Sequence, residues 1–244
     1  MGQESSSTRS TIELTKRRER AERILDAASE LLLRYGYNRI TIDDIARKAK
    51  VGKGTVYLHW RTRESLFGTL MLREVLAFWR EILTRLHADP TEVLLHRAMR
   101  SMIFVGMERP LGRALFTGNR ELLGKLAESG FGGLPQSQQI VLKEGYLALL
   151  RSHGLLRSDT DRAAQEYALR ATVNGFLHLD SFLTGEEQLP IEVKADALAQ
   201  TIRRAFEPDE LPSGTALQDA ASNVIEWLEQ LCAITEQRLN EQMT

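Results

Sequence analysis

The sequence has little cysteine and no long apolar run. Its one cysteine, Cys232, excludes an intramolecular disulfide. The first thirty residues contain no basic segment followed by an apolar stretch, and every apolar run is far shorter than the roughly 20 residues of a membrane-spanning helix. We therefore expect a soluble, cytoplasmic protein with no membrane partner. Its 244 residues, 43% of them hydrophobic, suffice for one large domain or two unequal ones.

Residue patterns typical of catalytic and metal sites are also missing. No H-E-x-x-H or Cys-His ligand spacing occurs among the five histidines, which are His59, His87, His96, His153 and His178. No phosphate-binding G-x-x-x-x-G-K-[ST] loop is present, and the glycine cluster at residues 130–133 follows a predicted helix and precedes Pro135, which favours a loop. We expect no catalytic residue, no metal, no cofactor and no enzymatic activity.

The charges are unevenly distributed although the net charge is only −1. Residues 1–63 contain 14 Lys or Arg against 8 Asp or Glu, whereas the remaining residues contain 18 against 25. A basic end joined to an acidic body favours a polyanionic partner that binds at that end. A chance unevenness of solvated charge explains the same counts.

The first part of the chain predicts an arm followed by a helix. Residues 1–12 are rich in Ser and Thr without a hydrophobic period, so we expect a flexible arm over residues 1–14. Apolar residues then recur at steps of three and four, which predicts one helix from about Thr15. Gly36 is placed to end it. The predicted apolar stripe consists of Ile24, Ala27, Ala28, Leu31, Leu32 and Tyr35.

Two short helices follow, joined by a tight turn. Thr41 is suited to cap the first helix, whose predicted buried face consists of Ile42, Ile45, Ala46 and Ala49. Lys50 to Gly52 predict the turn, and the second helix spans about 53–59. The pair is a helix-turn-helix unit.

The rest of the chain predicts helices only, so the fold class is all-α. Proline and glycine separate the segments, with Thr62 a possible cap for the first of them. The predicted helices span about 63–87, 91–107, 110–128, 135–153, 160–183, 192–206 and 215–240. Leu217, Ala221, Val224, Ile225, Leu228 and Leu231 form one face of the last helix, which we expect to pack on the others.

The helix over 53–59, with the helix before it as a brace, has dimensions that fit the DNA major groove. Lys53 and Thr55 are suited to base edges, and Tyr57 and His59 to phosphate oxygens or a thymine methyl group. Gly52 and Gly54 allow a phosphate to approach the backbone at the helix start. Thr41 is suited to a phosphate at the start of the bracing helix.

Several residues of this region also have a purely structural interpretation. Apolar residues at helical spacing usually form a core, and we expect this of Ile42, Ile45, Ala46, Val51, Val56 and Trp60. The ring of Tyr57 can pack while its hydroxyl reaches a phosphate. Arg17, Arg18 and Arg20 are either solvated or bound to phosphate, and Arg9 could enter a minor groove.

The stretch ITIDDIARKAKVGKGTVYLHWRTRESL, residues 40–66, resembles the signature of the TetR family of transcriptional regulators. Matching positions are Thr41, Ile42, Ile45, Ala46, Ala49, Val51, Gly54, Thr55, Val56, Tyr57, His59, Trp60 and Leu66. The sequence departs from the family pattern at Lys50, where a turn glycine is usual, at Gly52, where a serine cap is usual, and at Arg63, where a lysine usually meets the DNA backbone. We expect these three departures to affect which DNA sequence is bound and not whether DNA is bound.

The resemblance implies a DNA-binding domain over residues 15–62, with Arg63 as a further DNA contact, and an effector-binding and dimerisation domain over 63–241. It implies that the helices at 160–183 and 192–206 pair with their copies in a homodimer, and that RATVNGFLHL is similar to a segment near that interface. It also implies a pocket for a small-molecule effector. The candidate lining residues are Phe78, Met99, Met102, Ile103, Met107, Phe116, Tyr146, Asn174 and His178, with Arg170 on the same stripe as the last two.

The same lining residues can be ordinary core residues, although Met is also suited to an adaptable binding surface. The implied function is a homodimeric repressor that is released from a palindromic double-stranded DNA operator by a ligand. An activator or a ligand-independent regulator of the same fold remains an alternative. An architectural DNA-binding protein is disfavoured because its basic residues would cover the whole surface, whereas this chain has a large acidic body.

Overall fold

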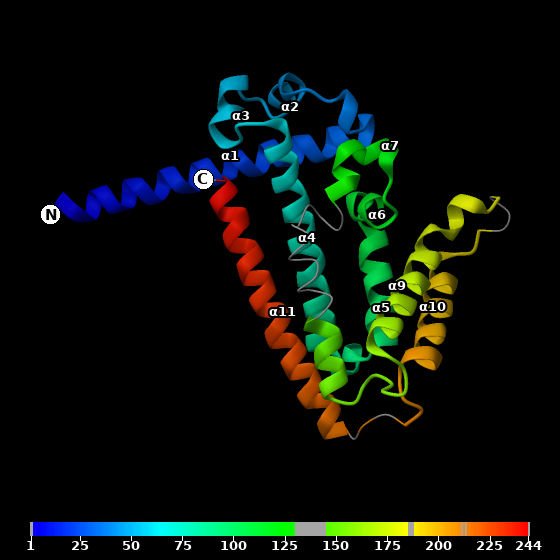
Figure 1. The fold of residues 1–244 in the computed structure, drawn as a ribbon. Coiled ribbons are helices and arrows are strands. Elements are labelled where there is room, and N and C mark those ends of the chain that lie inside the picture. Colours follow the sequence, from blue (N-terminus) through cyan, green and yellow to red (C-terminus); the bar gives the residue numbers. More distant parts are fainter. Residues whose placement is uncertain (1, 130–144, 185–187, 211, 213, 244) are drawn as a thin grey trace. The chain divides into compact units, whose positions relative to one another are not determined.

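The computed structural model describes residues 2–129, 145–184, 188–210, 212 and 214–243 (Figure 1). All regular elements in these ranges are helices, which confirms the predicted all-α class. The chain divides into two compact units. The first contains Met1–Leu76, Gly118–Leu134 and Ala233–Thr244, and the second contains Ala77–Thr117 and Pro135–Cys232. None of the helices described combines the length and apolar character needed to cross a bilayer.

The boundary between the units differs from the predicted one at residues 62 and 63. Two long helices, α4 (Arg63–Ala88) and α11 (Gly214–Met243), each contribute residues to both units. A continuous helix gives no composition change or proline at such a boundary, so the sequence could not mark it.

The first unit begins with α1 (Gly2–Tyr35), η1 (Tyr37–Arg39), α2 (Ile42–Lys48) and α3 (Lys53–His59). The predicted start of the first helix at Thr15 is wrong, because α1 is helical from Gly2 through the stretch predicted as a flexible arm. No proline interrupts that stretch, and Ser, Thr and Glu are tolerated in helices. The predicted end at Gly36 is confirmed by its φ of 74°.

The core of the first unit forms where α1 meets the two short helices. The predicted stripe is confirmed for Ile24, Ala27, Ala28 and Leu32, but Tyr35 is exposed. Val56 and Trp60 are buried with the predicted face of α2, and Tyr37 packs edge-on against Phe67 with ring centroids 5.1 Å apart. Burying each large side chain contributes about 1.5–3 kcal/mol, so these contacts hold the short helices in place.

The second unit contains the end of α4 followed by η2 (Pro90–Val93), α5 (Leu95–Glu108) and α6 (Pro110–Phe116). Residues 145–152 are helical. They precede α9 (Arg162–His178), η5 (Leu179–Phe182), α10 (Ile191–Phe206) and the first part of α11. The predicted helices over 63–87, 192–206 and 215–240 agree closely with α4, α10 and α11. Residues 135–144 of the predicted helix over 135–153 lie outside the described residues.

The predicted helix over 110–128 is wrong, because the chain forms three short helices there. After α6 come α7 (Arg120–Leu123) and η3 (Gly124–Ser129). Gly118 and Gly124 have φ values of 58° and 53°, which a right-handed helix does not allow, and Asn119 caps α7 by accepting a hydrogen bond from the Leu122 amide.

In the second unit, α5 packs extensively against α10. The buried side of α10 consists of Ala195, Leu198, Ala199, Ile202 and Phe206. Glu207, which is fully buried, accepts a hydrogen bond from the backbone amide of His96 at 2.7 Å and lies 2.8 Å from its Nδ1. The carboxylate therefore satisfies the first turn of α5, where backbone amides lack helical partners.

The turn after α2 contains Lys50 with φ of 55°, the one non-glycine residue with positive φ in the described part of the chain. A left-handed conformation costs an L-residue about 1–2 kcal/mol. We expect Lys50→Gly to raise the free energy of unfolding of the first unit by about 1 kcal/mol. Lys50→Ala, which keeps the Cβ, should give no such gain. Urea unfolding of both variants measures this, and equal stability of the two would contradict a backbone origin.

Candidate nucleic-acid interface

The start of α2 is fixed by a reciprocal cap. The Asp44 amide donates to Thr41 Oγ1 at 3.2 Å, and the Thr41 amide and hydroxyl both donate to Asp44 Oδ2, at 3.0 and 2.6 Å. Hydrogen bonds from Thr41 lower the pKa of the Asp44 carboxyl, so it is ionised at neutral pH. The predicted Thr41 cap is confirmed, and its hydroxyl proton is engaged within the protein.

The start of α3 is open at both glycines. Gly52 caps the helix with an extended backbone, φ −72° and ψ 148°, and no side chain bonds to the first turn. A Cβ on Gly54 would meet nothing within 4 Å, and one on Gly52 would make only an ordinary contact with Thr55. No neighbouring group of the protein therefore requires glycine at these two positions. The space beside their Cα atoms is open to a partner molecule.

Lys53, at the first position of α3, forms an ion pair with Asp43 of α2. Its Nζ donates to Asp43 Oδ2 at 2.6 Å, and this bond raises the pKa of Lys53. Both side chains are about half exposed, so solvent screens the pair and its contribution to stability is small. The ammonium group thus lies between the two helices. An anion that binds it more strongly can replace Asp43 as its partner.

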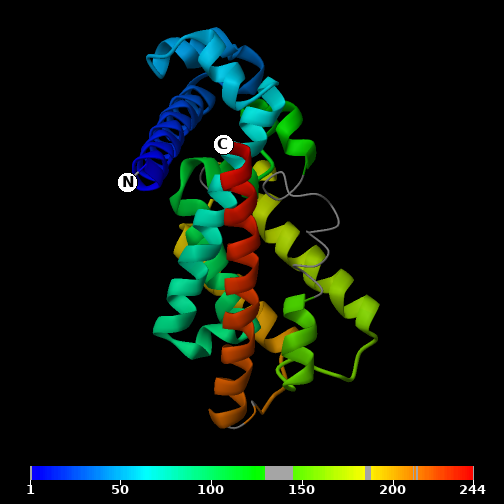
Figure 2. The same cartoon turned by 90° about the vertical axis from the view of Figure 1, so that its left-hand side faces the viewer.

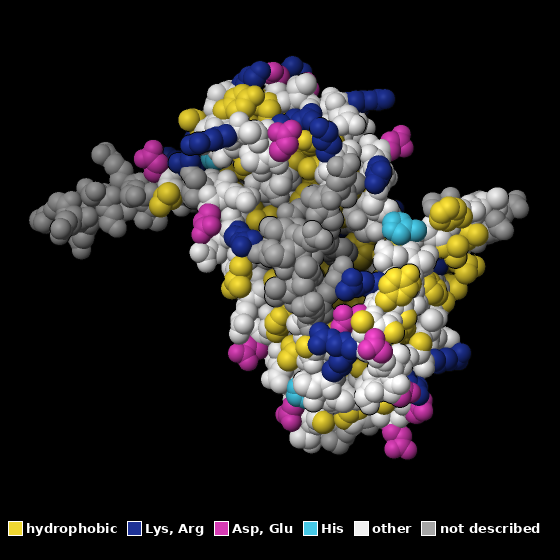
Figure 3. Space-filling view, in the orientation of Figure 1, with side chains coloured by type: hydrophobic (Ala, Val, Ile, Leu, Met, Phe, Trp, Pro, Cys, Tyr) yellow, Lys and Arg dark blue, Asp and Glu magenta, His cyan; other side chains and the backbone are white. Residues whose placement is uncertain are grey.

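The outer side of α3 continues with Tyr57, which is 44% exposed, and Leu58, which is 73% exposed. Thr55 is half-buried. Leu58 was not among the residues predicted from the sequence to contact DNA. Leu58 lies two residues from both Val56 and Trp60, which places it on a different face of the helix from these buried residues. This spacing could have identified Leu58 as exposed. Lys and Arg side chains are visible over this end of the unit (Figure 3).

His59 and Arg63 face inward more than the sequence predicted. His59 Nδ1 lies 3.0 Å from the backbone oxygen of Met243 at the end of α11. The Arg63 guanidinium donates to the backbone oxygens of Tyr37 and Ile40, and its Cζ lies 4.1 Å from the centre of the Tyr37 ring. Arg63 therefore fixes η1 to α4, and its charge is partly used within the unit.

Trp60 anchors the end of α3. Its side chain is 2% exposed, and its indole Nε1 donates to Thr69 Oγ1 of α4 at 2.8 Å. On the other side, the Arg17 guanidinium of α1 donates to the Leu58 carbonyl at 3.4 Å. Arg17 was predicted to be solvated or phosphate-bound, and in the structure it contacts α3. The helix is thus buried along one side and open along the other.

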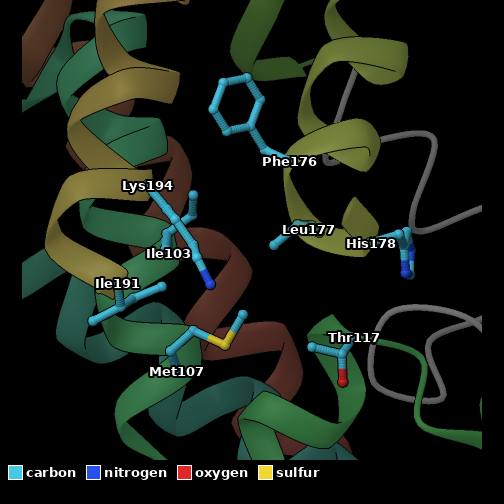
Figure 4. A pocket seen from close by; sticks show the side chains of 8 residues that line it. All are labelled: Ile103, Met107, Thr117, Phe176, Leu177, His178, Ile191 and Lys194. Atoms are coloured by element: carbon cyan, nitrogen blue, oxygen red, sulfur yellow. The ribbon is translucent and has the colours of Figure 1, made fainter. Parts of the chain in front are cut away.

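The second unit contains a cavity of about 150 Å³ between α5, α9 and α10. Three predicted effector residues, Ile103, Met107 and His178, line it. Thr117, Phe176, Leu177, Ile191 and Lys194 complete the lining and were not predicted. Figure 4 shows the Met107 and Lys194 side chains directed into the space, while His178 lies at its edge and is turned away.

The other predicted effector residues are not part of this lining. Phe78 is buried in an aromatic cluster with Trp79 and Phe116, and Tyr146 donates its hydroxyl hydrogen bond to the Val93 carbonyl at 2.9 Å. Burial raises the pKa of the Tyr146 hydroxyl, which keeps it neutral. Asn174 is exposed and donates to the Arg170 carbonyl. Met99 and Met102 are half-buried on α5. The interpretation as ordinary core fits Phe78 best.

A short helix that is buried on one side and braced by a second helix defines the helix-turn-helix class of DNA-binding proteins. Residues 24–70 match the family model described as "Bacterial regulatory proteins, tetR family". An HTH-type transcriptional regulator of Mycobacterium bovis is 26% identical over 180 residues, which cover 64% of this chain and 93% of the relative. QacR of Staphylococcus aureus is 39% identical over 46 residues, 19% of this chain and 24% of QacR.

Among solved structures, this chain is similar to SmeT, the repressor of the Stenotrophomonas maltophilia multidrug efflux pump SmeDEF. The two are 26% identical, with a TM-score of 0.53 over 80% of this chain and 95% of SmeT. Residues 24–70 therefore match the DNA-binding domain of the tetR family, and most of the chain is similar to HTH-type transcriptional regulators. The resemblance seen in the sequence is confirmed.

The environment of His59 predicts a pH dependence of stability. Burial lowers the pKa of the imidazole, and the charges of Arg17 and Arg20 lower it further, against the effect of the Met243 carbonyl. Because the folded state disfavours protonation, stability is complete above the unfolded pKa of about 6.5 and falls as the pH drops below it. We expect His59→Gln to flatten the melting temperature measured between pH 7.5 and 5. An identical pH profile in the wild type and the variant would contradict this.

Proposed function

We propose that this chain is a homodimeric repressor that binds a palindromic DNA operator and is released by a small molecule. The observation that carries the proposal is α3, whose Val56 and Trp60 are buried while Lys53, Tyr57 and Leu58 are directed outward. Two such helices in a dimer would read half-sites one helical turn apart, about 34–36 Å.

In the proposed complex, Lys53 and Thr55 contact base edges, and Leu58 contacts a thymine methyl group. Gly52 and Gly54 admit a phosphate to the open start of the helix, and Thr41 and Tyr57 donate to phosphates. Because Nδ1 of His59 must donate to the Met243 carbonyl, its Nε2 carries a proton for a phosphate only when the ring is charged. Arg63 acts in this proposal mainly by holding η1.

The proposed dimer interface is formed by α9 and α10, as the resemblance implies. Large apolar side chains are exposed along these helices, including Tyr167 at 77% and Phe182, in the adjoining η5, at 83%. Figure 3 shows hydrophobic side chains along this edge. Exposed apolar residues in such a row favour a second copy of the chain as the partner.

The proposed effector site is the cavity between α5, α9 and α10. Its lining is largely apolar, with Lys194 and Thr117 as polar groups. A cavity of about 150 Å³ admits a molecule of roughly the size of benzene. Mass spectrometry of small molecules that copurify with the protein would identify candidates.

The test of DNA binding is the selection of duplexes from a random pool, followed by affinity measurements. We expect Lys53→Met to weaken binding to the selected duplex about tenfold, because a base-edge contact is worth about 1–3 kcal/mol. Asp43→Asn should strengthen binding, since it removes an anion near DNA and releases Lys53. Affinity should fall steeply with salt as counterions are released.

Lys125→Met is the matched control, since Lys125 is an exposed lysine of η3 in the same unit. It should leave the affinity nearly unchanged. Equal affinities of the wild type, Lys53→Met and Asp43→Asn would exclude α3 as the recognition helix.

The dimer interface has its own test. We expect Tyr167→Glu to shift the protein from dimer to monomer in light scattering, because a charge cannot be buried there without a partner. Ile234→Glu is the control, since Ile234 is also an exposed apolar residue but lies on α11. A dimer that persists in Tyr167→Glu, or dissociates in both variants, would contradict the proposed interface.

A further inference from the structure

The last three turns of α11 belong to the same compact unit as the helix-turn-helix. Ala233–Thr244 group with α1, α2 and α3, although the helix begins in the other unit. Thr235, Leu239 and Met243 are buried at intervals of four residues along one side. Both views show the end of α11 beside the start of α4 (Figures 1 and 2). A polar or unattached tail would not bury such a stripe.

The first polar link joins the end of α11 to His59 of α3. The last carbonyls of a helix have no partner within it, and the Met243 oxygen is one of these. It lies 3.0 Å from Nδ1 of His59. A carbonyl only accepts, so Nδ1 must carry the proton, and this hydrogen bond fixes the tautomer of the ring. The end of α11 is thereby capped by the last residue of α3.

The second link runs through Thr69 of α4. The Thr69 hydroxyl, which is fully buried, accepts from the Trp60 indole at 2.8 Å. It also lies 2.8 Å from Gln242 Oε1 and 2.9 Å from the Ser65 carbonyl. A hydroxyl has one proton, so it donates to one of these oxygens at a time. Gln242 and the Ser65 carbonyl thus share the proton of the hydroxyl that accepts from the Trp60 indole, and Gln242 contributes to the orientation of that hydroxyl.

We propose that Gln242 and the Met243 backbone are positioning residues for DNA recognition, which hold the C-terminal end of α3 through Trp60 and His59. This inference rests on the proposed function of α3. A helix of seven residues is not stable alone, so its direction depends on its anchors. Side chains that read base edges must be held to within about 0.5 Å, and a rotation about the Trp60 anchor would displace all of them.

The experiment compares two glutamines of the same helix. Gln242→Leu removes the acceptor near Thr69, and Gln237→Leu is the matched control, since Gln237 is exposed and donates to Glu241 within α11. Affinity is measured for a duplex selected by the wild type and for an unselected duplex. We expect Gln242→Leu to bind the selected duplex about fivefold to tenfold more weakly, as expected for one lost hydrogen bond, with the unselected duplex and the melting temperature little changed.

A spectroscopic measurement separates positioning from general stability. The indole N–H resonance of Trp60, assigned with Trp60→Phe, should move in Gln242→Leu and stay in place in Gln237→Leu. In a Thr69→Val background, Gln242→Leu should cause no further loss of affinity, because the two residues act in one chain.

An unchanged affinity and an unchanged Trp60 resonance in Gln242→Leu would overturn the inference while leaving the proposed function intact. An equal loss in Gln237→Leu would overturn it as well. Selection of no duplex by the wild-type protein would overturn the proposed function and this inference together.

Discussion

The burial of Trp60 is the constraint on which the arrangement of the helix-turn-helix in the first unit depends. The indole lies in the core of the first unit and donates its one polar hydrogen to Thr69. Packing therefore fixes the position of the ring, and the hydrogen bond fixes its orientation. Val56 is buried one turn earlier on the same side. The burial of these two residues sets the orientation of α3 about its own axis, so that Lys53, Tyr57 and Leu58 face outward. An apolar contact inside the unit therefore determines which side chains are available to a partner.

The exposed side of α3 is prepared for an anion but is not saturated with positive charge. Lys53 is paired with Asp43, and the Thr41 hydroxyl is occupied by Asp44. In the proposed complex each of these bonds is exchanged for one to DNA, so the net free energy gained per DNA contact is smaller than that of the contact itself. The loss of these internal bonds lowers the affinity for DNA of any sequence. Discrimination between DNA sequences then depends on the contacts to bases. It fits a regulator better than a packaging protein.

Local features were predictable from the sequence because neighbouring residues cause them. The Thr41 cap and the Gly36 end of α1 each follow from a few adjacent residues. The link between His59 and Met243 was not predictable, because the two residues are 184 positions apart and no periodicity connects them. The cavity lining was predicted only in part for the same reason, since α5, α9 and α10 contribute residues that meet only in the folded chain.

Chemical probing of guanine N7 atoms in a selected duplex would test the central claim most directly, because N7 lies in the major groove. If two copies of α3 read successive major grooves, protein binding will protect two groups of guanines about 10–10.5 base pairs apart on one face of the duplex. Protection confined to the minor groove, or a single unpaired footprint, would contradict the account.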